Sequence, residues 1–287
     1  MTNEQLIKKM KEDMNMRNFS KYTYDSYLGK TRDIIRYYGE KQLEEVTTEE
    51  LREFLLKYLK DERKLSDRSI NYYNSVIRFI YEVTLDKLIN KKQLPMRKKK
   101  KTLYKVLTKE ELSTFFNMCD NFKFKTIFML VYGSGLRIGE VANLRVEDID
   151  SKNMRIFVRA GKGNKERYTI LPKQSLEMLR EYWRKYRQHK RRGRIFLSES
   201  GKAITVGVIR EHFRKYRKKA KINEKATLHT FRHNFATDLI ERGATLIQVK
   251  ELMGHSNIRS TMEYVHVANV KLDLESPLDA FLKGEVK

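Results

Sequence analysis

The 287-residue chain contains only one cysteine, one tryptophan and three prolines. The single cysteine, Cys119, cannot form a disulfide within the chain, and we expect a small, partly buried thiol in a reducing compartment. No segment approaches the roughly 20 consecutive apolar residues of a membrane-spanning helix. The opening MTNEQLIKKMKEDM contains acidic residues and does not resemble a secretory signal. These absences predict a cytoplasmic protein without a membrane partner.

Negative charge is also scarce relative to positive charge. The chain has 61 lysines and arginines against 37 aspartates and glutamates, which gives a formal net charge of +24. Such an excess repels itself in a compact protein unless a polyanion neutralises it, so nucleic acid is the expected partner. A chain of this length can form one large domain or two modest ones, and we expect two.

Residues 1–90 carry the pattern of a small helical domain. Four stretches place apolar residues three and four positions apart, and no alternating strand pattern interrupts them. The third stretch has the clearest start, because Thr47 and Glu50 form a capping box. Ser20 and Gly39 are expected to begin and end the second helix.

This helical domain could lay a basic surface across a DNA groove. The candidate contacts are basic, aromatic and amide side chains near helix starts, namely Lys21, Tyr22, Arg68, Asn71 and Tyr72. A solvated helix face, with tyrosines that belong to the core and keep a wet hydroxyl, remains the alternative.

A basic linker is predicted from 91 to 105. Pro95 interrupts the helical pattern, and the run that follows places like charges side by side without an apolar face. That run consists of Arg97, Lys98, Lys99, Lys100 and Lys101. We expect the linker to be extended and free unless it meets phosphate, so a disordered hinge and a DNA contact are both open.

A second domain is predicted from 106 to 270. Thr108 and Glu111 form a capping box at its first helix. The motif YGSGLRIGE contains paired glycines, which permit a break between two helices and place Arg137 near the start of the second. Glu140, three residues later, is expected to orient the Arg137 guanidinium or to cap the helix.

A β-hairpin is predicted within this domain. Apolar residues alternate with polar ones around Ile156 and Val158, and again around Tyr168 and Ile170. The intervening GKGNK has the glycines and the asparagine that a hairpin turn needs. The expected fold is therefore mainly α with a small β-hairpin, in which a helical domain precedes a mixed α+β domain.

Lysine and arginine are also concentrated elsewhere in this domain. The hairpin turn carries Lys162 and Lys165, and spacing alone does not choose between them. Basic runs at 184–194 and 214–221 could hold phosphates through sequence-independent electrostatic contacts, or could be solvated helix faces.

The stretch from 227 to 266 is the most densely polar part of the chain. His229, Arg232 and His233 are three and four positions apart, so on a helix they share one face. A cationic face of this kind needs an anionic partner.

Two further polar side chains follow that helix. A second helix is predicted to end at Gly254, which places His255 on the turn just beyond it. Tyr264 comes nine residues later in a short segment, where Met262 and Val265 are the expected packing residues. A tyrosine at that position could reach back to the histidines.

The order His-x-x-Arg-His, then Gly-His, then Tyr resembles the second half of the signature of the tyrosine recombinases, the phage integrase family. With Arg137 in YGSGLRIGE and Lys162 in GKGNKER upstream, the resemblance covers about 107 to 267. The preceding part resembles the family's helical core-binding domain by position and helix content. The resemblance implies the catalytic set Arg137, Lys162, His229, Arg232, His255 and Tyr264, supported by Glu140 and His233.

The resemblance also implies a mechanism. Tyr264 attacks a DNA phosphodiester, expels a 5′-hydroxyl and keeps the phosphate as a 3′-phosphotyrosyl ester. Arg137 and Arg232 bind the non-bridging oxygens as their charge builds up. A tyrosine with a pKa near 10 is ionised in only about one part in a thousand at pH 7, so it needs a proton acceptor.

The resemblance gives the proton transfers to three further residues. His229 is the candidate base for the tyrosine, and His255 holds a phosphate oxygen or the attacking phenol. Lys162, selected over Lys165 by the resemblance, protonates the leaving hydroxyl.

Zinc binding is the competing interpretation of the histidines. His229 and His233 have the spacing of a zinc pair, with His255 and His266 as possible further ligands. Arg232 lies between them, and a cation beside a metal dication is disfavoured. We therefore expect neither a metal nor another cofactor.

The expected function is site-specific recombination of double-stranded DNA by two domains that clamp the duplex. The resemblance implies a homotetramer on paired sites, or assembly with a partner recombinase. Chain length favours an Xer-like enzyme that resolves chromosome or plasmid dimers. The integrase or transposase of a mobile element is the alternative, followed by a type IB topoisomerase and a non-catalytic DNA-binding protein.

The last residues, 271–287, are predicted to be a docking tail. Leu278, Phe281 and Leu282 fall at helical spacing, but they are too few to form a stable helix alone. The tail must therefore dock on its own domain or, as the resemblance implies, on a neighbouring subunit.

The charge excess predicts DNA binding that weakens steeply with salt. A clamp that touches roughly six to ten phosphates should lose about three to five orders of magnitude in affinity between about 50 and 200 mM salt. Titrations of labelled duplex DNA at several salt concentrations measure this slope. A nearly flat dependence would mean that the basic runs do not touch DNA.

Overall fold

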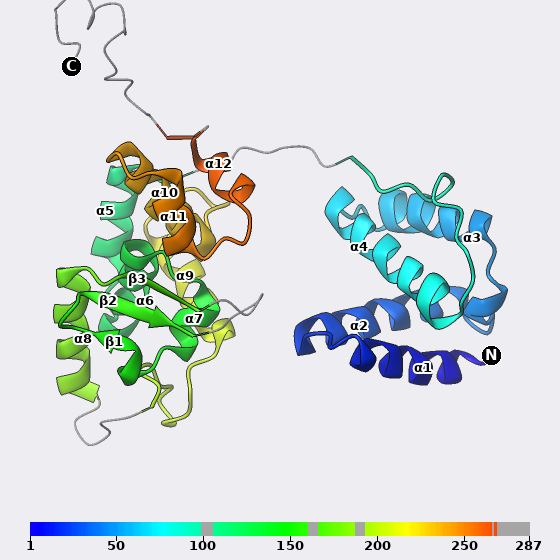
Figure 1. Ribbon diagram of the computed structural model, residues 1–287, viewed down its shortest axis with the longest axis horizontal. Coiled ribbons are helices and arrows are strands. Elements are labelled where there is room, and N and C mark those ends of the chain that lie inside the picture. The colour runs from blue at the N-terminus through cyan, green and yellow to red at the C-terminus, as the bar shows by residue number, and fades with distance from the viewer. Residues whose placement is uncertain (99–105, 160–165, 187–192, 266, 269–287) are drawn as a thin grey trace, which may run out of the picture. The chain divides into compact units, whose positions relative to one another are not determined.

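The protein forms two compact units, Met1–Lys101 and Thr102–Lys287 (Figure 1). The structure is a computed structural model, and it describes residues 1–98, 106–159, 166–186, 193–265 and 267–268. Helices dominate both units, and the second also contains a three-stranded sheet. The predicted fold class, mainly α with a small sheet, is therefore confirmed.

The N-terminal unit contains the four predicted helices. They are α1 (Asn3–Met16), α2 (Lys21–Tyr38), α3 (Thr48–Glu53) and α4 (Asp67–Arg78). A short 3-10 turn, η1 (Leu43–Glu45), precedes α3, while α3 and α4 run on into the π-helical segments η2 (Phe54–Glu62) and η3 (Phe79–Thr84). The predicted caps are confirmed, because the Thr47 hydroxyl accepts a hydrogen bond from the Glu50 amide and Gly39 ends α2 at a φ of 63°.

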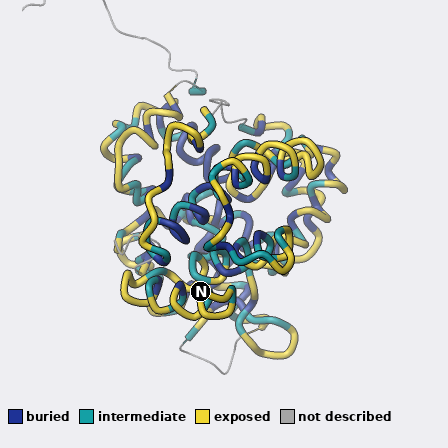
Figure 2. The backbone as a smooth tube through the Cα atoms, turned by 90° about the vertical axis from the view of Figure 1, so that its right-hand side faces the viewer, coloured by how far each residue is buried: buried dark blue, intermediate teal, exposed yellow. Residues whose placement is uncertain are grey.

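The inward sides of these helices form one apolar core. Figure 2 shows buried and exposed positions alternating along the helices, as expected for amphipathic helices. Tyr73 is fully buried in this core, and its hydroxyl donates a hydrogen bond of 2.7 Å to Asp33. Because the buried hydroxyl is satisfied, the tyrosine adds its ring to the core without leaving an orphaned polar group.

The beginning of the predicted linker is held on the N-terminal unit. Leu94 is buried, and the Asn74 amide donates hydrogen bonds to the carbonyls of Leu94 and Pro95 at 3.1 and 3.3 Å. Asn71 exchanges two hydrogen bonds with the Arg97 backbone, at 2.9 and 2.8 Å. The predicted basic run from Lys99 onwards lies outside the described residues.

The C-terminal unit surrounds a small sheet with helices. Its helices are α5 (Lys109–Met118), α6 (Phe122–Ser134), α7 (Ile138–Asn143), α8 (Lys173–Tyr186), α9 (Val206–Lys219), α10 (Leu228–Glu241), α11 (Leu246–Met253) and α12 (Arg259–Val265). The 3-10 turn η4 (Val146–Asp148) leads into the strands β1 (Ile149–Asp150), β2 (Arg155–Val158) and β3 (Arg167–Ile170). The capping box at Thr108 and Glu111 is confirmed at the start of α5.

Helix α6 is the centre of this unit. It is apolar around most of its circumference, so neighbours must cover it on several sides. Helices α8 and α10 both pack against it. Phe115 of α5 meets Phe128 of α6 at a ring distance of 5.5 Å and Phe231 of α10 at 5.0 Å, so one aromatic cluster joins three helices.

The sheet is antiparallel in the order β1-β2-β3, and β2 has the predicted burial, with Ile156 and Val158 inside. The prediction that Tyr168 and Ile170 form the inner face of β3 is wrong. Thr169 pairs with Ile156 and is buried, whereas Tyr168 and Ile170 are 48% and 38% exposed.

The inward face of β3 is polar because its side chains find buried partners. The Thr169 hydroxyl donates a hydrogen bond of 2.7 Å to the carbonyl of Ser134. Arg167, opposite Val158, faces the same way as Thr169 and forms an ion pair with Glu140. Specific buried acceptors therefore override the hydrophobic alternation.

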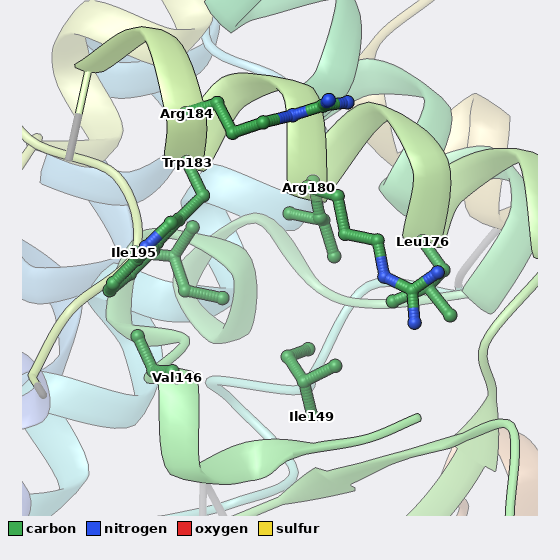
Figure 3. A pocket seen from close by; sticks show the side chains of 8 residues that line it. Val146, Ile149, Leu176, Arg180, Trp183, Arg184 and Ile195 are labelled. Carbon is green, nitrogen blue, oxygen red and sulfur yellow. The ribbon is translucent and has the colours of Figure 1, made fainter. Parts of the chain in front are cut away.

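A cavity of about 440 Å³ lies between α8 and the chain around Val146, Ile149 and Ile195 (Figure 3). Trp183 and Arg180 reach into this region from α8. None of its lining residues belongs to the predicted site.

The described part of the chain has no helix long and apolar enough to cross a membrane. Cys119 is buried, and burial raises the pKa of its thiol to about 12.

Asn234 fixes the first residues of the C-terminal unit to α10. It is buried, its amide donates to the Leu107 carbonyl at 2.7 Å, and its carbonyl accepts from the Leu107 amide at 3.0 Å. Asn234→Ala leaves both backbone groups of Leu107 unsatisfied, so the free energy of unfolding should fall by about 2–4 kcal/mol. Urea denaturation measures the change.

Asn143→Ala is the matched control. The Asn143 amide also donates to a backbone carbonyl, that of Gly139 at 2.8 Å, but it is exposed. Its loss should change stability by less than about 0.5 kcal/mol. Equal losses for the two variants would contradict the role assigned to Asn234.

Candidate active site

Helix α10 brings three of the predicted site residues together. His229, Arg232 and His233 occupy its first two turns. The rings of His229 and His233 meet nearly perpendicular at a centroid distance of 4.5 Å, which confirms that they share a face. Their exposure differs, because His229 is exposed at the helix start whereas His233 is buried.

Arg232 is the most deeply placed cation of the site, with a side chain only 1% exposed. Its terminal nitrogens donate hydrogen bonds to the carbonyls of Gly135 and Met253. Its buried Nε has no hydrogen-bond partner within the described residues. Burial, and then the nearby positive charge of Arg137, lower the pKa of Arg232 to about 9, so it remains a cation at neutral pH.

The glycine-containing break before α7 positions Arg137. Gly135 adopts a left-handed φ of 61°, and its α-carbon lies against Phe235, where an added Cβ would approach the ring to 2.3 Å. Arg137 follows as the residue that caps α7, and its side chain is 38% exposed. Its guanidinium donates to Glu140 at 2.8 Å and to the Gly254 carbonyl at 3.3 Å.

Glu140 lies between three arginines, and the supporting role predicted for it agrees with these contacts. Its carboxylate is bound by Arg137 and by Arg167, and an Arg232 nitrogen lies 4.0 Å away. Burial alone would raise the pKa of Glu140, but the hydrogen bonds and charge of Arg167, with those of Arg137, hold it at about 2.

Three guanidinium groups around one carboxylate leave a net charge of +2 at this point of the molecule. This excess positive charge is partly buried, and a partly buried positive charge favours the binding of an anion. Arg167, on β3, was not among the sequence-predicted site residues. Its only sequence signal is the polar character of the face that it shares with Thr169.

The turn after α11 holds His255. Thr245 caps the start of α11, and Gly254 ends the helix with a left-handed φ of 61°, both as predicted. Nδ1 of His255 lies 2.9 Å from the Thr261 hydroxyl, which anchors the imidazole to α12. His255 is therefore held between two helices.

Tyr264 reaches back to the histidines, as predicted. It lies on α12 with only 3% of its surface exposed. Its hydroxyl is 3.0 Å from Nδ1 of His233, and its ring stacks on His255 at 6.1 Å. The expected packing residues were wrong, because Met262 and Val265 are 50% and 38% exposed.

Helix α12 buries a different pair of positions. Thr261 and Tyr264 are three residues apart and face inward together, which turns Met262 and Val265 outward. Both inward side chains contact His255, so these contacts determine which side of α12 faces inward.

All three histidines of the site favour their neutral form. Burial, then neighbouring positive charge, lowers the pKa of His233 to about 3 and that of His255 to about 4. Desolvation, followed by the charges of Arg232 and Arg137, also lowers the pKa of His229. A neutral imidazole has one ring nitrogen that accepts hydrogen bonds, but the lowered pKa also makes each of these rings a weaker base.

A cavity of about 530 Å³ joins the site to α9. Arg137 and His229 line one part of it, and α9 contributes three arginines at helical spacing. These arginines are Arg210, Arg214 and Arg217. The basic run predicted from 214 to 221 thus begins beside the predicted catalytic residues, whereas Arg210 was missed.

The remaining predicted contacts lie in the N-terminal unit or outside the described residues. Lys21, Tyr22, Arg68 and Lys98 are exposed, whereas Tyr72 packs its ring 5.7 Å from Tyr27. Besides its backbone contacts with Asn71, Arg97 forms an ion pair with Asp67 at 2.5 Å. Lys99, Lys100, Lys101, Lys162, Lys165, His266 and the tail 271–287 lie outside the described residues.

Within residues 1–98, 106–159, 166–186, 193–265 and 267–268 there is no group of three histidine, cysteine, aspartate or glutamate side chains that could hold a metal ion. The His229 and His233 pair is accompanied here by Arg232 and by the Tyr264 hydroxyl.

The lowered pKa of His233 predicts how stability depends on pH. Below about pH 6.5 the unfolded chain protonates this histidine, whereas the folded ring stays neutral down to about pH 3. The unfolded state then binds one more proton, so the free energy of unfolding falls as the pH drops through this window. His233→Gln should make the dependence between about pH 6 and pH 4 shallower, by up to about 1.4 kcal/mol per pH unit.

Urea denaturation of both proteins at several pH values measures the two slopes. Equal slopes would show that His233 is not held neutral in the folded protein.

Comparison with known proteins gives the same family for both units. Residues 105–270 match the Phage integrase family, and residues 6–91 match the phage integrase N-terminal SAM-like domain. The tyrosine recombinase XerA of Pyrococcus horikoshii is 33% identical over 263 residues, which cover 87% of this chain and 88% of that protein.

Solved structures share the fold at low sequence identity. The Tn1549 transposon integrase, in complex with transposon right end DNA, has a TM-score of 0.73 at 19% identity and covers 99% of both chains. A lambda integrase dimer bound to a COC′ core site has a TM-score of 0.74 at 18% identity and covers 96% of this chain and 100% of that one. On the sequence matches to both units and to a full-length relative, the chain belongs to the phage integrase family and is a tyrosine recombinase.

Proposed function

We propose that this recombinase cuts and rejoins double-stranded DNA at specific sites through a 3′-phosphotyrosyl intermediate formed by Tyr264. One observation supports this above the others. The Tyr264 hydroxyl lies against a neutral histidine, beside a partly buried cluster of three arginines and one glutamate. A nucleophile with an adjacent proton acceptor and a surplus of fixed positive charge is what attack on a phosphodiester requires.

The reaction exchanges one phosphate ester bond for another, so it needs no external energy source. The Tyr264 oxygen bonds to phosphorus, the bond from phosphorus to the 5′ oxygen breaks, and the phenolic proton passes to a histidine. Lys162 then gives a proton to the departing 5′ oxygen, with Lys165 as the rival at the same turn. Reversal by the 5′-hydroxyl of another strand rejoins DNA, so no cofactor is required.

The arginines have separate parts in this scheme. Arg137 and Arg232 bind the non-bridging oxygens of the scissile phosphate. Arg137 is accessible, but Arg232 and Tyr264 are 1% and 3% exposed. A phosphate can touch Arg232 and Tyr264 only after the groups that cover these two side chains move.

The histidines have two different roles, because one accepts the tyrosine proton and the others hold the phenol or a phosphate oxygen in place. In this structure Tyr264 contacts His233, while His229 opens onto the cavity that Arg137 also lines. We assign the proton acceptor in the DNA complex to His229, as the family resemblance implies, and the support of unreacted Tyr264 to His233. His255 holds a phosphate oxygen or the phenol.

DNA is held by both units acting as a clamp. The unit covering 1–90 contributes Lys21, Tyr22, Arg68, Asn71 and Tyr72, the linker at 91–105 contributes its basic run, and 106–270 is the catalytic domain. The arginines on α9 extend the positive surface away from Arg137. The lambda integrase dimer on its core site supports assembly on DNA, and we propose a tetramer on paired sites in which the tail 271–287 docks on a neighbouring subunit.

Resolution of chromosome or plasmid dimers is the biological role we propose. The 33% identity to XerA over most of both chains supports it. The likeness to the Tn1549 transposon integrase supports the second candidate, an integrase or transposase of a mobile element.

Covalent trapping in the native cells tests the reaction and its target together. Cells are lysed directly into denaturant, the tagged protein is purified, and attached DNA is sequenced. The wild type should carry DNA that ends at one site, and Tyr264→Phe should carry none. Tyr216→Phe is the matched control, because Tyr216 is also buried and its hydroxyl is bonded to Asp120 at 2.7 Å.

The outcomes separate the alternatives. Adducts with Tyr264→Phe would overturn the nucleophile, and none with the wild type would overturn the reaction. One chromosomal site outside any mobile element would support dimer resolution, element ends would support the integrase, and scattered ends would support a topoisomerase.

A further inference from the structure

Arg167 is tied more firmly into the candidate site than either proposed phosphate ligand, yet it has no part in the scheme above. Its side chain is only 7% exposed. Two of its nitrogens bind the two oxygens of Glu140, each at 2.8 Å, and its Nε donates to the Leu252 carbonyl, also at 2.8 Å. All three nitrogens of the Arg167 guanidinium are therefore already bonded to protein groups.

Each contact of Arg167 leads to a different part of the site. Glu140, which Arg167 holds in place, in turn holds Arg137 by accepting hydrogen bonds from the Arg137 amide and guanidinium at 2.7 and 2.8 Å. The Leu252 carbonyl belongs to the last turn of α11, whose next carbonyl, of Met253, accepts from Arg232. One guanidinium therefore fixes the supports of both phosphate-binding arginines.

The same side chain supports the turn that carries His255. Cδ of Arg167 lies 2.7 Å from the position where a Cβ on Gly254 would stand, and Nε and a terminal nitrogen lie 3.1 Å from it. The carbonyl of Gly254 accepts from Arg137. The turn is thus packed on Arg167 from one side and bonded to Arg137 from another.

We infer that Arg167 is a positioning residue for strand cleavage, which aligns Arg137, Arg232 and the His255 turn on the scissile phosphate. The inference rests on the proposed function. Only a planar guanidinium can hold both oxygens of Glu140 and a backbone carbonyl at once, whereas an ammonium group is a single point charge. Lysine would preserve the charge of the site and lose its alignment.

Arg167→Lys is the first test. Its substrate is a DNA duplex with the site recovered from wild-type adducts, nicked next to the cleavage position so that the adduct accumulates. We expect affinity for the intact site within about threefold of wild type, because phosphate contacts elsewhere persist. The rate of adduct formation at saturating protein should fall about a hundredfold, as displacements near 1 Å at a reacting centre do.

Arg155→Lys is the matched control. Arg155 lies on the neighbouring strand β2 and forms an ion pair of 2.8 Å with Asp150, but it is 44% exposed and bonds none of the site residues. Its cleavage rate should stay within about threefold of wild type, as expected for a surface pair.

A second substrate separates alignment from general loss of structure. A methylphosphonate at the scissile position replaces one non-bridging oxygen by a methyl group, so less negative charge needs arginine in the transition state. If Arg167 aligns the arginines, the defect of Arg167→Lys should shrink from about a hundredfold to less than about tenfold on this substrate. A defect of the same size on both substrates would reduce Arg167 to a structural residue and overturn the inference.

Gly254→Ala provides an independent variant in case Arg167→Lys does not fold. The new methyl group must displace Arg167, so the same substrate-dependent defect is expected. Gly39→Ala is the control for a positive φ without a steric clash. Gly39 has a φ of 63° against 61° for Gly254, its ψ is -120° against 47°, and no atom lies within 4 Å of the added Cβ.

Two results would be decisive against the inference. One is cleavage by Arg167→Lys within about threefold of wild type on the natural phosphate. The other is a defect of Gly254→Ala no larger than that of Gly39→Ala. Failure of the proposed function is distinguishable, because the wild type itself would then form no adduct.

Discussion

The catalytic unit depends on one buried carboxylate. Glu140 binds Arg137 and Arg167 directly and lies 4.0 Å from Arg232. Without it, three guanidinium groups would repel one another in a poorly solvated region, and this repulsion would oppose the packing of α7, α10 and β3. With it, the cluster keeps a surplus of positive charge that only a further anion can neutralise. The carboxylate therefore lets three arginines lie close together while the cluster keeps a net positive charge.

The same positive cluster determines the state of the histidines. His229, His233 and His255 are all held neutral by desolvation and by nearby cations. A neutral imidazole can accept a hydrogen bond from a phenol, whereas an imidazolium cannot. The positive charge of the arginines and the neutral state of the histidines are thus not independent features, because the arginines lower the pKa of these histidines. Tyr264 is placed where both effects act on its hydroxyl.

Local signals in the sequence predicted where helices begin and end in both units. The capping boxes at Thr47 and Thr108, and the glycines that end α2 and α11, act through contacts between near neighbours in the chain, so a short window contains the information. The inner face of β3 could not be predicted in this way. Thr169 and Arg167 turn inward because Ser134 and Glu140, about 30 residues earlier, offer acceptors. Periodicity shows hydrophobic pairing, but it does not show a buried ion pair between distant segments.

The sequence motif predicted which site residues lie close together, but it did not predict which of them are buried from solvent. Arg232 is buried because α10 is buried on most sides, and Tyr264 is buried because Thr261 and Tyr264 turn α12 inward. Met262 and Val265 are exposed and leave apolar surface on the outside of α12. This apolar surface could pack against another surface. Under the proposed function, the scissile phosphate can reach the Tyr264 hydroxyl only after the groups that cover it move.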